Sequence, residues 1–291
     1  MPVRSRHAEA AAEADPAELL LVGPGAGGGT VRIGDTVRRE PGRASDAMLS
    51  VLRHLESVGF AGAPRVLGQD DRGRRVLSYV HGDVALPPYQ PWAADDSLLT
   101  SVATLLRDYH RAVADYRPPP GIRWPTRAPA DQRGALVGHL DVSMANVVCR
   151  GGRAVALIDF EEVGLVTALW DVVRTVRHWV PLLAPEDIPD GLAGLRGRQG
   201  ERLRLFADTY GLTAAERAAL VETVLLNADD SYERMRLGAA DGHPGYSAEW
   251  TGQAARRNRR ARDWVQANRG CLEGWLSGRL PGDGVRGEPH D

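Results

Sequence analysis

The order in which strand-like and helix-like segments follow one another constrains the fold of this chain more than any other feature. Short aliphatic or β-branched runs bounded by Gly, Asp and Pro predict strands at residues 19–22, 30–33, 36–39, 65–68 and 76–80. One helix interrupts them. We expect Ser45 to cap it and an apolar stripe to pack on the sheet, made of Met48, Val51, Leu52 and Leu55. From His81 onward apolar residues recur at helical spacing, for example over residues 98–109, which predicts a small sheet-rich part followed by a larger helical part.

The basic residues exclude several kinds of chemistry. The 291-residue chain has 36 basic side chains, and reading the sequence shows that all of them are arginine. A chain without lysine has no lysine Schiff base, no pyridoxal phosphate attachment and no GxxxxGK[ST] phosphate loop. The formal net charge of -2 gives no overall attraction to nucleic acid or to anionic lipid, so we expect neither as a partner.

The cysteines and the apolar segments indicate the cellular compartment in which the protein is expected. The two cysteines, Cys149 and Cys271, are far apart and form no CxxC motif, which argues against a disulfide framework or a cysteine zinc site. No apolar run approaches the roughly 18 residues of a membrane helix, and residues 1–15 lack the apolar core of a signal peptide. These features predict a cytoplasmic protein.

A short β-hairpin is expected in the middle of the helical part. Residues 147–149 and 154–158 are apolar, and the linker 150–153 contains two glycines. Polar side chains flank the hairpin on both sides, with His139, Asp141 and Asn146 before it and Asp159 after it. Because a hairpin folds back on itself, we expect Asn146 and Asp159 to lie close together. An amide and a carboxylate oxygen suit Mg²⁺, and Asp141 is placed to accept a proton from a hydroxyl nucleophile.

The same residues resemble a known family. HxDxxxxN, present as His139, Asp141 and Asn146, followed by a strand that ends in Asp159-Phe160, is similar to the catalytic and metal-binding segments of the aminoglycoside phosphotransferases and of choline kinase-like proteins. The string Leu-Trp-Asp at residues 169–171 is also similar to that family. The resemblance implies a bilobal protein-kinase-like α+β fold in which Asp141 and His139 belong to the catalytic group. It also implies that Asn146 and Asp159 hold Mg²⁺. Within this set, we expect His139 to brace the loop rather than to transfer a proton.

The resemblance also implies how a nucleotide binds. Residues 17–80 would form the nucleotide-binding lobe and residues 81–280 the catalytic and substrate-binding lobe, with mobile ends at 1–16 and 281–291. Gly27 and Gly28 would lie in the loop above the phosphates of ATP or GTP, since glycine lets backbone amides approach an anion. The backbone of Ser78 and Val80 would bond the edge of the base. Glu161 would assist a second metal ion or orient the site.

Three departures from the family pattern change the expected site. The strand lysine of kinase-like lobes is replaced within Thr36-Val37-Arg38-Arg39, and alternate strand residues face opposite sides, so one arginine must take its place. We favour Arg38, with Arg39 as the other choice. The helix that normally supplies a glutamate partner has only Asp46 near its start and Glu56 near its end. The usual glycine between the His and the Asp of the loop is Leu140, which narrows the conformational freedom of the backbone.

The sequence constrains the phosphoryl acceptor less than it constrains the nucleotide that donates the phosphoryl group. The predicted function is transfer of the γ-phosphoryl group to a hydroxyl of a small molecule, and the resemblance favours an antibiotic or related natural product such as an aminoglycoside or a basic cyclic peptide. A metabolite kinase for choline, homoserine or a sugar shares the motifs. A nucleotide-binding pseudokinase is suggested by the missing lysine. For a cationic acceptor, an acidic pocket would be formed by Asp229, Asp230 and Glu233, which otherwise face water. The arginine-rich residues 256–262 are expected to be a solvated helix face.

Overall fold

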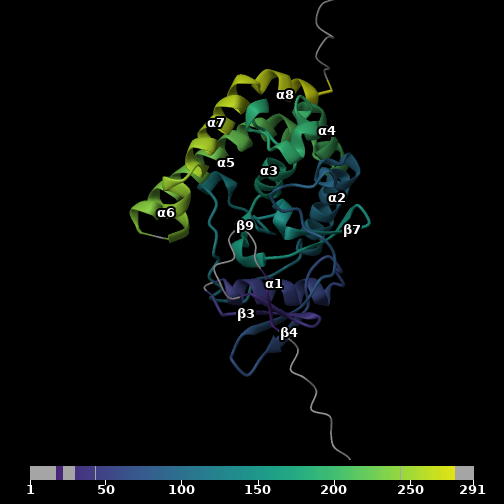
Figure 1. Cartoon of the computed structure of the whole chain (residues 1–291), viewed down its shortest axis with the longest axis vertical. Helices are drawn as coiled ribbons and strands as arrows, with labels where there is room; N and C mark the ends of the chain where they lie inside the picture. Colours follow the sequence, from purple (N-terminus) through teal and green to yellow (C-terminus); the bar gives the residue numbers. More distant parts are fainter. Residues whose placement is uncertain (1–17, 22–29, 43, 243, 279–291) are drawn as a thin grey trace, which may run out of the picture.

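The computed structural model describes residues 18–21, 30–42, 44–242 and 244–278. Its first part is an antiparallel sheet with strand order β1-β2-β3-β5-β4. The sheet lies at one end of the molecule, with the last helices at the opposite end (Figure 1). Its strands are β1 (Leu19–Leu20), β2 (Val31–Ile33), β3 (Thr36–Arg39), β4 (Val66–Gln69) and β5 (Arg75–Ser78). The predicted strand positions are confirmed to within two residues for the described part of each run.

Helix α1 (Ser45–Ser57) lies next to this sheet and buries the predicted stripe. Met48, Val51, Leu52 and Leu55 are all buried, because i, i+3, i+4 and i+7 place them on one face. The predicted capping role of Ser45 is wrong. The helix already includes Ser45, its N-cap is Ala44, and the Ser45 hydroxyl accepts a hydrogen bond from the Gly42 amide at 2.8 Å. The hydroxyl therefore stabilises the segment that precedes the helix and does not cap the first helical turn.

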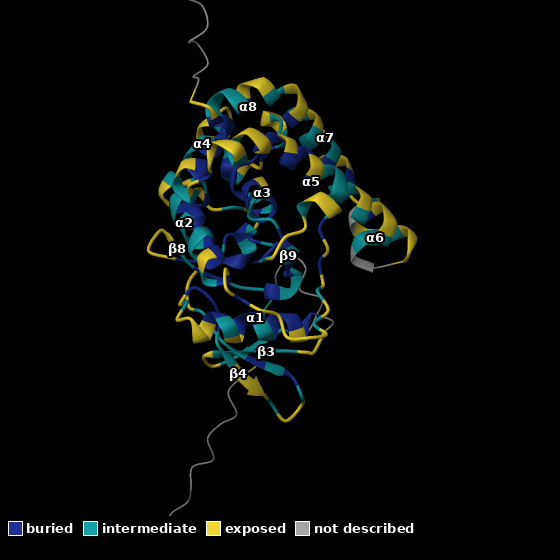
Figure 2. Ribbon diagram, turned by 180° about the vertical axis from the view of Figure 1, so that it is seen from behind, coloured by how far each residue is buried: buried dark blue, intermediate teal, exposed yellow. Residues whose placement is uncertain are grey.

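The second part is mostly helical, as predicted. Figure 2 shows the buried faces of its helices turned toward one another and their exposed faces turned outward. Thr213 and Glu216 form a capping box at the start of α5. Trp179 and Phe206 are fully buried in the core that these helices share. The helices are α2 (Asp96–Ala112), α3 (Ala168–Trp179), α4 (Gln199–Tyr210), α5 (Ala214–Ala240), α6 (Pro244–Thr251), α7 (Ala254–Ala267) and α8 (Arg269–Leu276).

Two small antiparallel sheets position the polar clusters within the helical part. The predicted hairpin is confirmed as β7 (Val147–Arg150) and β8 (Arg153–Leu157). Its turn residues Gly151 and Gly152 have φ of 56° and 72°, a left-handed conformation that glycine adopts without steric cost. Strand β6 (Leu136–Gly138) pairs with β9 (Gly164–Val166). The segments after β6 and after β8 therefore emerge next to each other, and these are the segments that carry Asp141 and Asp159.

Several predictions fall outside the described residues. Gly27 and Gly28 lie there, as do the predicted mobile ends at 1–16 and 281–291. The boundary between the lobes at residues 80 and 81 stays a prediction. Within the described residues, none of the helices combines the length and the apolar composition needed to cross a bilayer.

Candidate active site

The loop from His139 to Asn146, called here the catalytic loop, is fixed in position by a buried carboxylate of helix α3. Asp171 of α3 is fully buried and accepts hydrogen bonds from the backbone amides of His139 and Leu140, each at 2.8 Å. His110 contacts the same carboxylate at 2.9 Å. Burial alone would raise the pKa of Asp171, but these hydrogen bonds outweigh burial and hold it below its ordinary value. The carboxylate therefore stays ionised and fixes the start of the loop.

The backbone of the loop is strained at Leu140. Its φ is 66°, in the left-handed region that β-carbon sterics disfavour. Among the described non-glycine residues, Asp159 is the other with a positive φ, at 64°. Such conformations cost about 1–3 kcal/mol each and persist where surrounding contacts over-determine them. Here the contacts are the Asp171 carboxylate on the Leu140 amide and the Arg174 guanidinium on the Leu140 carbonyl. The substitution of leucine for glycine is therefore accommodated by a left-handed leucine.

His139 braces the loop. Its ring is fully buried, Nδ1 accepts from the Asp141 amide at 3.3 Å, and Nε2 lies 3.1 Å from the Ile158 carbonyl oxygen. Because a carbonyl only accepts, the proton is assigned to Nε2. Burial lowers the pKa of His139, which keeps the ring neutral. Both ring nitrogens are thus occupied by the backbone, and the ring ties the catalytic loop to the end of β8.

Asp141 and Asn146 are in direct contact at the two ends of the loop. The Asn146 amide nitrogen donates to Asp141 Oδ2 at 2.6 Å and to the Asp141 carbonyl oxygen at 3.0 Å. Burial raises the pKa of the Asp141 carboxyl to about 7, against the opposing charge of Arg174. A carboxyl with a pKa near neutrality is suited to proton transfer at physiological pH.

Asp159 pairs with an arginine from the N-terminal sheet. Arg39 Nη1 donates to Asp159 Oδ1 at 2.8 Å, and Arg39 Nη2 lies 2.7 Å from Glu161 Oε2. Burial raises the pKa of Glu161, with the charge of Arg39 opposing. The helix acids take no part in this network: Asp46 is exposed, and Glu56 faces Arg65 at 3.5 Å. The carboxylates that orient the strand arginine therefore come from the segment after β8.

The prediction that Arg38, rather than Arg39, faces the cleft is wrong. Arg38 lies 3.6 Å from Asp70 and donates to the Thr36 hydroxyl, on the other side of β3. Arg39 lines the cleft together with Asp159. Neighbouring strand residues point to opposite faces, so one of the two had to turn away, and the sequence did not determine which.

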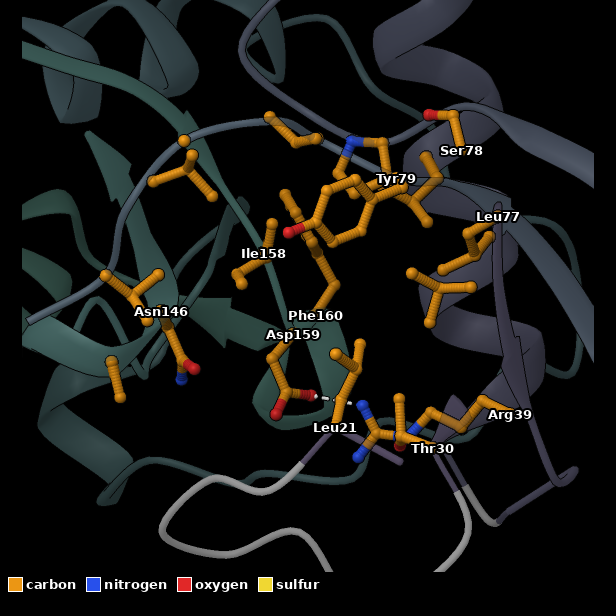
Figure 3. Close-up of a pocket in the computed structure, with 18 of the residues that line it drawn as sticks. Leu21, Thr30, Arg39, Leu77, Ser78, Tyr79, Asn146, Ile158, Asp159 and Phe160 are labelled. Atoms are coloured by element: carbon orange, nitrogen blue, oxygen red, sulfur yellow. Dashed lines mark hydrogen bonds and ion pairs between the residues drawn. The ribbon is translucent and has the colours of Figure 1, made fainter. Parts of the chain in front are cut away.

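The cleft itself has an apolar end and a polar end. Leu77 and Tyr79 lie at one end, and Asn146, Asp159 and Arg39 lie at the other (Figure 3). Ser78 and Val80 also line it, but the Ser78 amide already donates to the Arg65 carbonyl at 2.9 Å. Among the described residues, the backbone of Val80 makes no hydrogen bond, so its donor and acceptor remain available. The arrangement fits a flat apolar group at one end and a charged group at the other.

Comparison with known proteins bears on the identity of the chain. Residues 122–206, which contain Asp141, Asn146, Asp159 and Asp171, match the phosphotransferase enzyme family. The trifolitoxin immunity protein of Rhizobium leguminosarum bv. trifolii is 32% identical over 280 residues, covering 89% of this chain and 99% of that protein. The chain belongs to the phosphotransferase enzyme family. It is therefore a small-molecule kinase by family.

Solved structures with low sequence identity share the protein-kinase-like fold of this phosphotransferase. The GDP complex of aminoglycoside 2'-phosphotransferase-IIIa matches with a TM-score of 0.58 at 12% identity, over 89% of this chain and 95% of that one. A choline/ethanolamine kinase family protein from Mesorhizobium loti matches with a TM-score of 0.54 at 18% identity, over 86% and 88% of the two chains. The predicted bilobal kinase-like α+β fold is confirmed.

The cleft of this phosphotransferase has oxygen donors that fit Mg²⁺. Asn146 uses its amide nitrogen to hold Asp141, so its amide oxygen is left for other ligands. Asp159 is 36% exposed, and its Oδ2 has no hydrogen-bond partner among the described residues. The described part of the chain contains no cluster of three His, Cys, Asp or Glu side chains that would hold a metal ion alone. A pair of oxygen donors suits Mg²⁺, which takes its remaining ligands from water and substrate phosphates.

The predicted acidic pocket on α5 is not formed. Asp229 pairs with Arg259 at 2.8 Å and with Arg262 at 3.1 Å, both on α7. Glu233 is 53% exposed and pairs with Arg236 at 2.9 Å. Residues 229 and 233 are one helical turn apart, but the packing of α7 against α5 neutralises the first and leaves the second on the surface.

The structure also corrects the predictions for Asp230 and for the arginine-rich residues 256–262. Asp230 pairs with Arg234 at 3.1 Å, and burial raises its pKa. The arginine-rich run on α7 is more than a solvated face, because Arg260 bonds Asp187 and two of its neighbours bond Asp229. These ion pairs connect α7 to the rest of the helical part.

The roles of two residues of the site, Asp171 and Arg174, were not predicted from the sequence. Asp171 carried a signal, since an acidic residue stands between Trp170 and Val172 in an apolar helix face. Such a carboxylate is buried only when it is hydrogen-bonded, so its position could have indicated a structural contact. Arg174 carried no such signal. Its position beside Asp141 depends on how α3 packs under the catalytic loop.

Proposed function

We propose that this phosphotransferase moves the γ-phosphoryl group of ATP or GTP to a hydroxyl of a small molecule, with Asp141 as the proton acceptor. The contact between Asp141 and Asn146 beside the Asp159–Arg39 pair carries the proposal, because it places a base next to the metal-binding pair and the phosphate-binding cation that line one end of the cleft. The base of the nucleotide lies against Leu77 and Tyr79, with the backbone groups of Val80 at its edge.

The residues have separate tasks in this reaction. The acceptor oxygen forms a bond to the γ-phosphorus, the bond from that phosphorus to the β–γ bridging oxygen breaks, and a nucleoside diphosphate leaves. The hydroxyl proton passes to Asp141, whose raised pKa suits it to hold that proton. Arg39 binds phosphate oxygens through its planar guanidinium. Asn146 and Asp159 would hold Mg²⁺, which would neutralise phosphate charge when bound, and Glu161 keeps Arg39 oriented.

An antibiotic or a related natural product is the favoured acceptor. Its support is the relative named as an immunity protein to trifolitoxin, which connects a chain of this family with protection from a toxin. The family relationship itself is equally compatible with a metabolite such as choline, homoserine or a sugar as acceptor. The Arg39 network speaks against a pseudokinase, since a cation stands beside Asp159 where a strand lysine is otherwise expected.

The test is phosphoryl transfer by the purified full-length chain. The protein is incubated with Mg²⁺, with ATP or GTP, and with a panel of hydroxylated antibiotics and metabolites, and the mass of each compound is followed. The expected result is a gain of one phosphate on at least one compound by the wild type and none by Asp141→Asn. Transfer at equal rates by both proteins would contradict the assigned role of Asp141. Nucleotide binding without transfer to any compound would favour the pseudokinase.

A further inference from the structure

Helix α3 holds both peptide groups that flank the α-carbon of Leu140. Asp171 and Arg174 are one helical turn apart on α3, so their side chains lie on the same face of the helix. Asp171 Oδ1 accepts a hydrogen bond from the Leu140 amide at 2.8 Å, and Arg174 Nε donates to the Leu140 carbonyl oxygen. The helix therefore binds the residue before the proposed base on both sides of its α-carbon.

The peptide group between Leu140 and Asp141 is fixed at both of its polar atoms. Its carbonyl oxygen accepts from Arg174, and its N–H donates to His139 Nδ1 at 3.3 Å. The Asp141 carbonyl oxygen in turn accepts from the Asn146 side-chain amide at 3.0 Å. Because the backbone of a residue sets the direction of its β-carbon and its allowed rotamers, these contacts determine where the Asp141 carboxylate points.

One oxygen of the Asp141 carboxylate is engaged and the other is not. Oδ2 accepts from the Asn146 amide nitrogen at 2.6 Å, whereas Oδ1 accepts no hydrogen bond from the described residues. Oδ1 is thus the atom left to take the proton of an acceptor hydroxyl. A general base must lie within hydrogen-bond distance of that proton, and a misplacement of about 1 Å can cost about 100-fold in rate. The orientation of the preceding peptide group therefore matters to the rate.

A leucine before the proposed base makes this backbone conformation costly to keep. The φ of Leu140 is 66°, and a left-handed conformation costs a residue with a β-carbon about 1–2 kcal/mol. The Leu140 side chain is buried in a small cluster with Ala128, Val166 and Trp170. This cluster anchors the side chain but not the peptide groups on either side of it. Hydrogen bonds to those peptide groups therefore keep the backbone from relaxing.

The bond to Leu140 sets the orientation of the Arg174 guanidinium. Among the described residues, the Leu140 carbonyl oxygen is the hydrogen-bond partner of Arg174, and Nη1 is buried without one. Burial lowers the pKa of this guanidinium, and the negative charges of Glu162, Asp141 and Asp171 oppose that effect. The charge of Arg174 is thus compensated by nearby carboxylates, while its one directed contact is to the backbone of the catalytic loop.

We propose that Arg174 is a positioning residue for phosphoryl transfer, because its bond to the Leu140 carbonyl oxygen keeps the Asp141 carboxylate directed at the acceptor hydroxyl. This inference rests on the proposed function and deepens it by adding a residue that supports the proton acceptor. Arg174 acts through the peptide group and not on the reacting atoms. It does not line the nucleotide cleft, so its loss should leave nucleotide binding unchanged.

Three substitutions of Arg174 separate the hydrogen bond from the charge. Glutamine has its Nε2 where arginine has Nε, so Arg174→Gln keeps a donor and loses the charge. Lysine has a methylene group at that position, so Arg174→Lys keeps the charge and loses the donor there. Arg174→Met places a methyl group at that position and loses both. Arg236→Met is the control, since Arg236 bonds Glu233 on the surface.

Steady-state kinetics test the effect of these substitutions on transfer. They are measured at pH 9, where the Asp141 carboxyl, with its pKa of about 7, is ionised. The acceptor is a compound that the wild type phosphorylates. We expect Arg174→Met and Arg174→Lys to lower kcat at least about tenfold, and Arg174→Gln to stay within about threefold of wild type. KM for Mg²⁺-ATP should change less than about twofold in all three, and Arg236→Met should match the wild type.

The peptide group gives a second measurement that does not depend on transfer. Leu140 and Asp141 are the one place in the sequence where aspartate directly follows leucine. Labelling leucine with ¹³C at the carbonyl and aspartate with ¹⁵N therefore gives a single NMR correlation, which comes from this peptide group. Loss of a hydrogen bond moves a carbonyl carbon signal upfield. We expect that change in Arg174→Met and Arg174→Lys, and a signal near the wild-type position in Arg174→Gln.

The outcomes distinguish this inference from the proposed function. A wild-type kcat in Arg174→Met, equal losses in Arg174→Gln and Arg174→Met, or full activity in Arg174→Lys alone would overturn the positioning role. An unmoved carbonyl signal in Arg174→Met would overturn it as well. Absence of transfer by the wild type would count against the proposed function, and an upfield carbonyl signal in Arg174→Met would then still support the hold of Arg174 on the catalytic loop.

Discussion

The two sides of the catalytic loop differ in how their charges are arranged. On the nucleotide side, the carboxylates Asp159 and Glu161 share one arginine, Arg39. On the acceptor side, next to α3, Arg174 donates to the Leu140 carbonyl oxygen, and the charges of Arg174 and Arg177 oppose the burial that raises the pKa of Asp141. An excess of carboxylates suits a metal ion with its phosphates. A metal-bound nucleotide therefore fits the side of Asp159, whereas Asp141 lies toward α3.

The largest expected effect comes from the residue that stands between the two sides. Asp141→Asn should lower kcat for phosphoryl transfer by about 10²–10⁴-fold, because it removes the proton acceptor. The dissociation constant for Mg²⁺-ATP should change less than about threefold, since Asp141 does not line the nucleotide cleft. Steady-state kinetics and calorimetry measure the two quantities. A large loss of nucleotide affinity would place Asp141 on the nucleotide side and contradict the separation of the two sides.

Removing the buried Asp171 carboxylate, which holds the catalytic loop between the two sides, should lower the stability of the protein. Asp171→Asn replaces an acceptor of two amide hydrogen bonds with a group that also donates, in a fully buried position. We expect the free energy of unfolding to fall by about 3 kcal/mol, as for a broken buried charge network. Urea denaturation measures this change, and Asp190→Asn on the surface is the control. A loss below about 0.5 kcal/mol would show that Asp171 does not hold the loop.

The two adjacent arginines of β3 distinguish the nucleotide side from the outer face of the sheet. Arg39→Gln should weaken Mg²⁺-ATP binding about tenfold, the effect of one lost charge-assisted contact to phosphate. Arg38→Gln, which changes the side chain facing Asp70, should weaken it less than about twofold. Calorimetric titration of both variants with Mg²⁺-ATP measures the two dissociation constants. The reverse order would return the phosphate-binding role to Arg38.

The smallest effect concerns the pH dependence of stability on the acceptor side. The pKa of His178 is lowered to about 3 in the folded protein, so the unfolded chain binds an extra proton below its ordinary value of 6.5. Stability from the neutral ring is therefore present above pH 6.5 and is lost as the pH falls toward 3. At pH 5 the His178→Gln variant should recover about 1 kcal/mol relative to wild type, a figure reduced for partial exposure. Urea midpoints at pH 7 and pH 5 test this, and an equal pH dependence in both proteins would contradict it.

The sequence predicted the nucleotide side better than the acceptor side, for a physical reason. The metal-binding candidates Asn146 and Asp159 flank one hairpin, so local pairing brings their backbones together, as Ile158 bonding the Asn146 carbonyl at 2.9 Å shows. The choice between Arg38 and Arg39 depended on which face of β3 turns toward the cleft. Arg174 and Arg234 meet because two helices far apart in the sequence pack together. The acidic residues of α5 were misread for the same reason, since only the packing of α7 reveals that Asp229 is already paired.

The most direct test of the account is whether Asn146 and Asp159 hold one divalent ion together with the nucleotide. Mn²⁺ in place of Mg²⁺ gives an electron paramagnetic resonance signal that changes when the ion binds in a protein–ATP complex. We expect an ATP-dependent bound Mn²⁺ signal in the wild type that is lost in Asp159→Asn and weakened in Asn146→Ala, while Asp190→Asn retains it. An unchanged bound signal in Asp159→Asn would contradict the account, because the ion would then be held elsewhere.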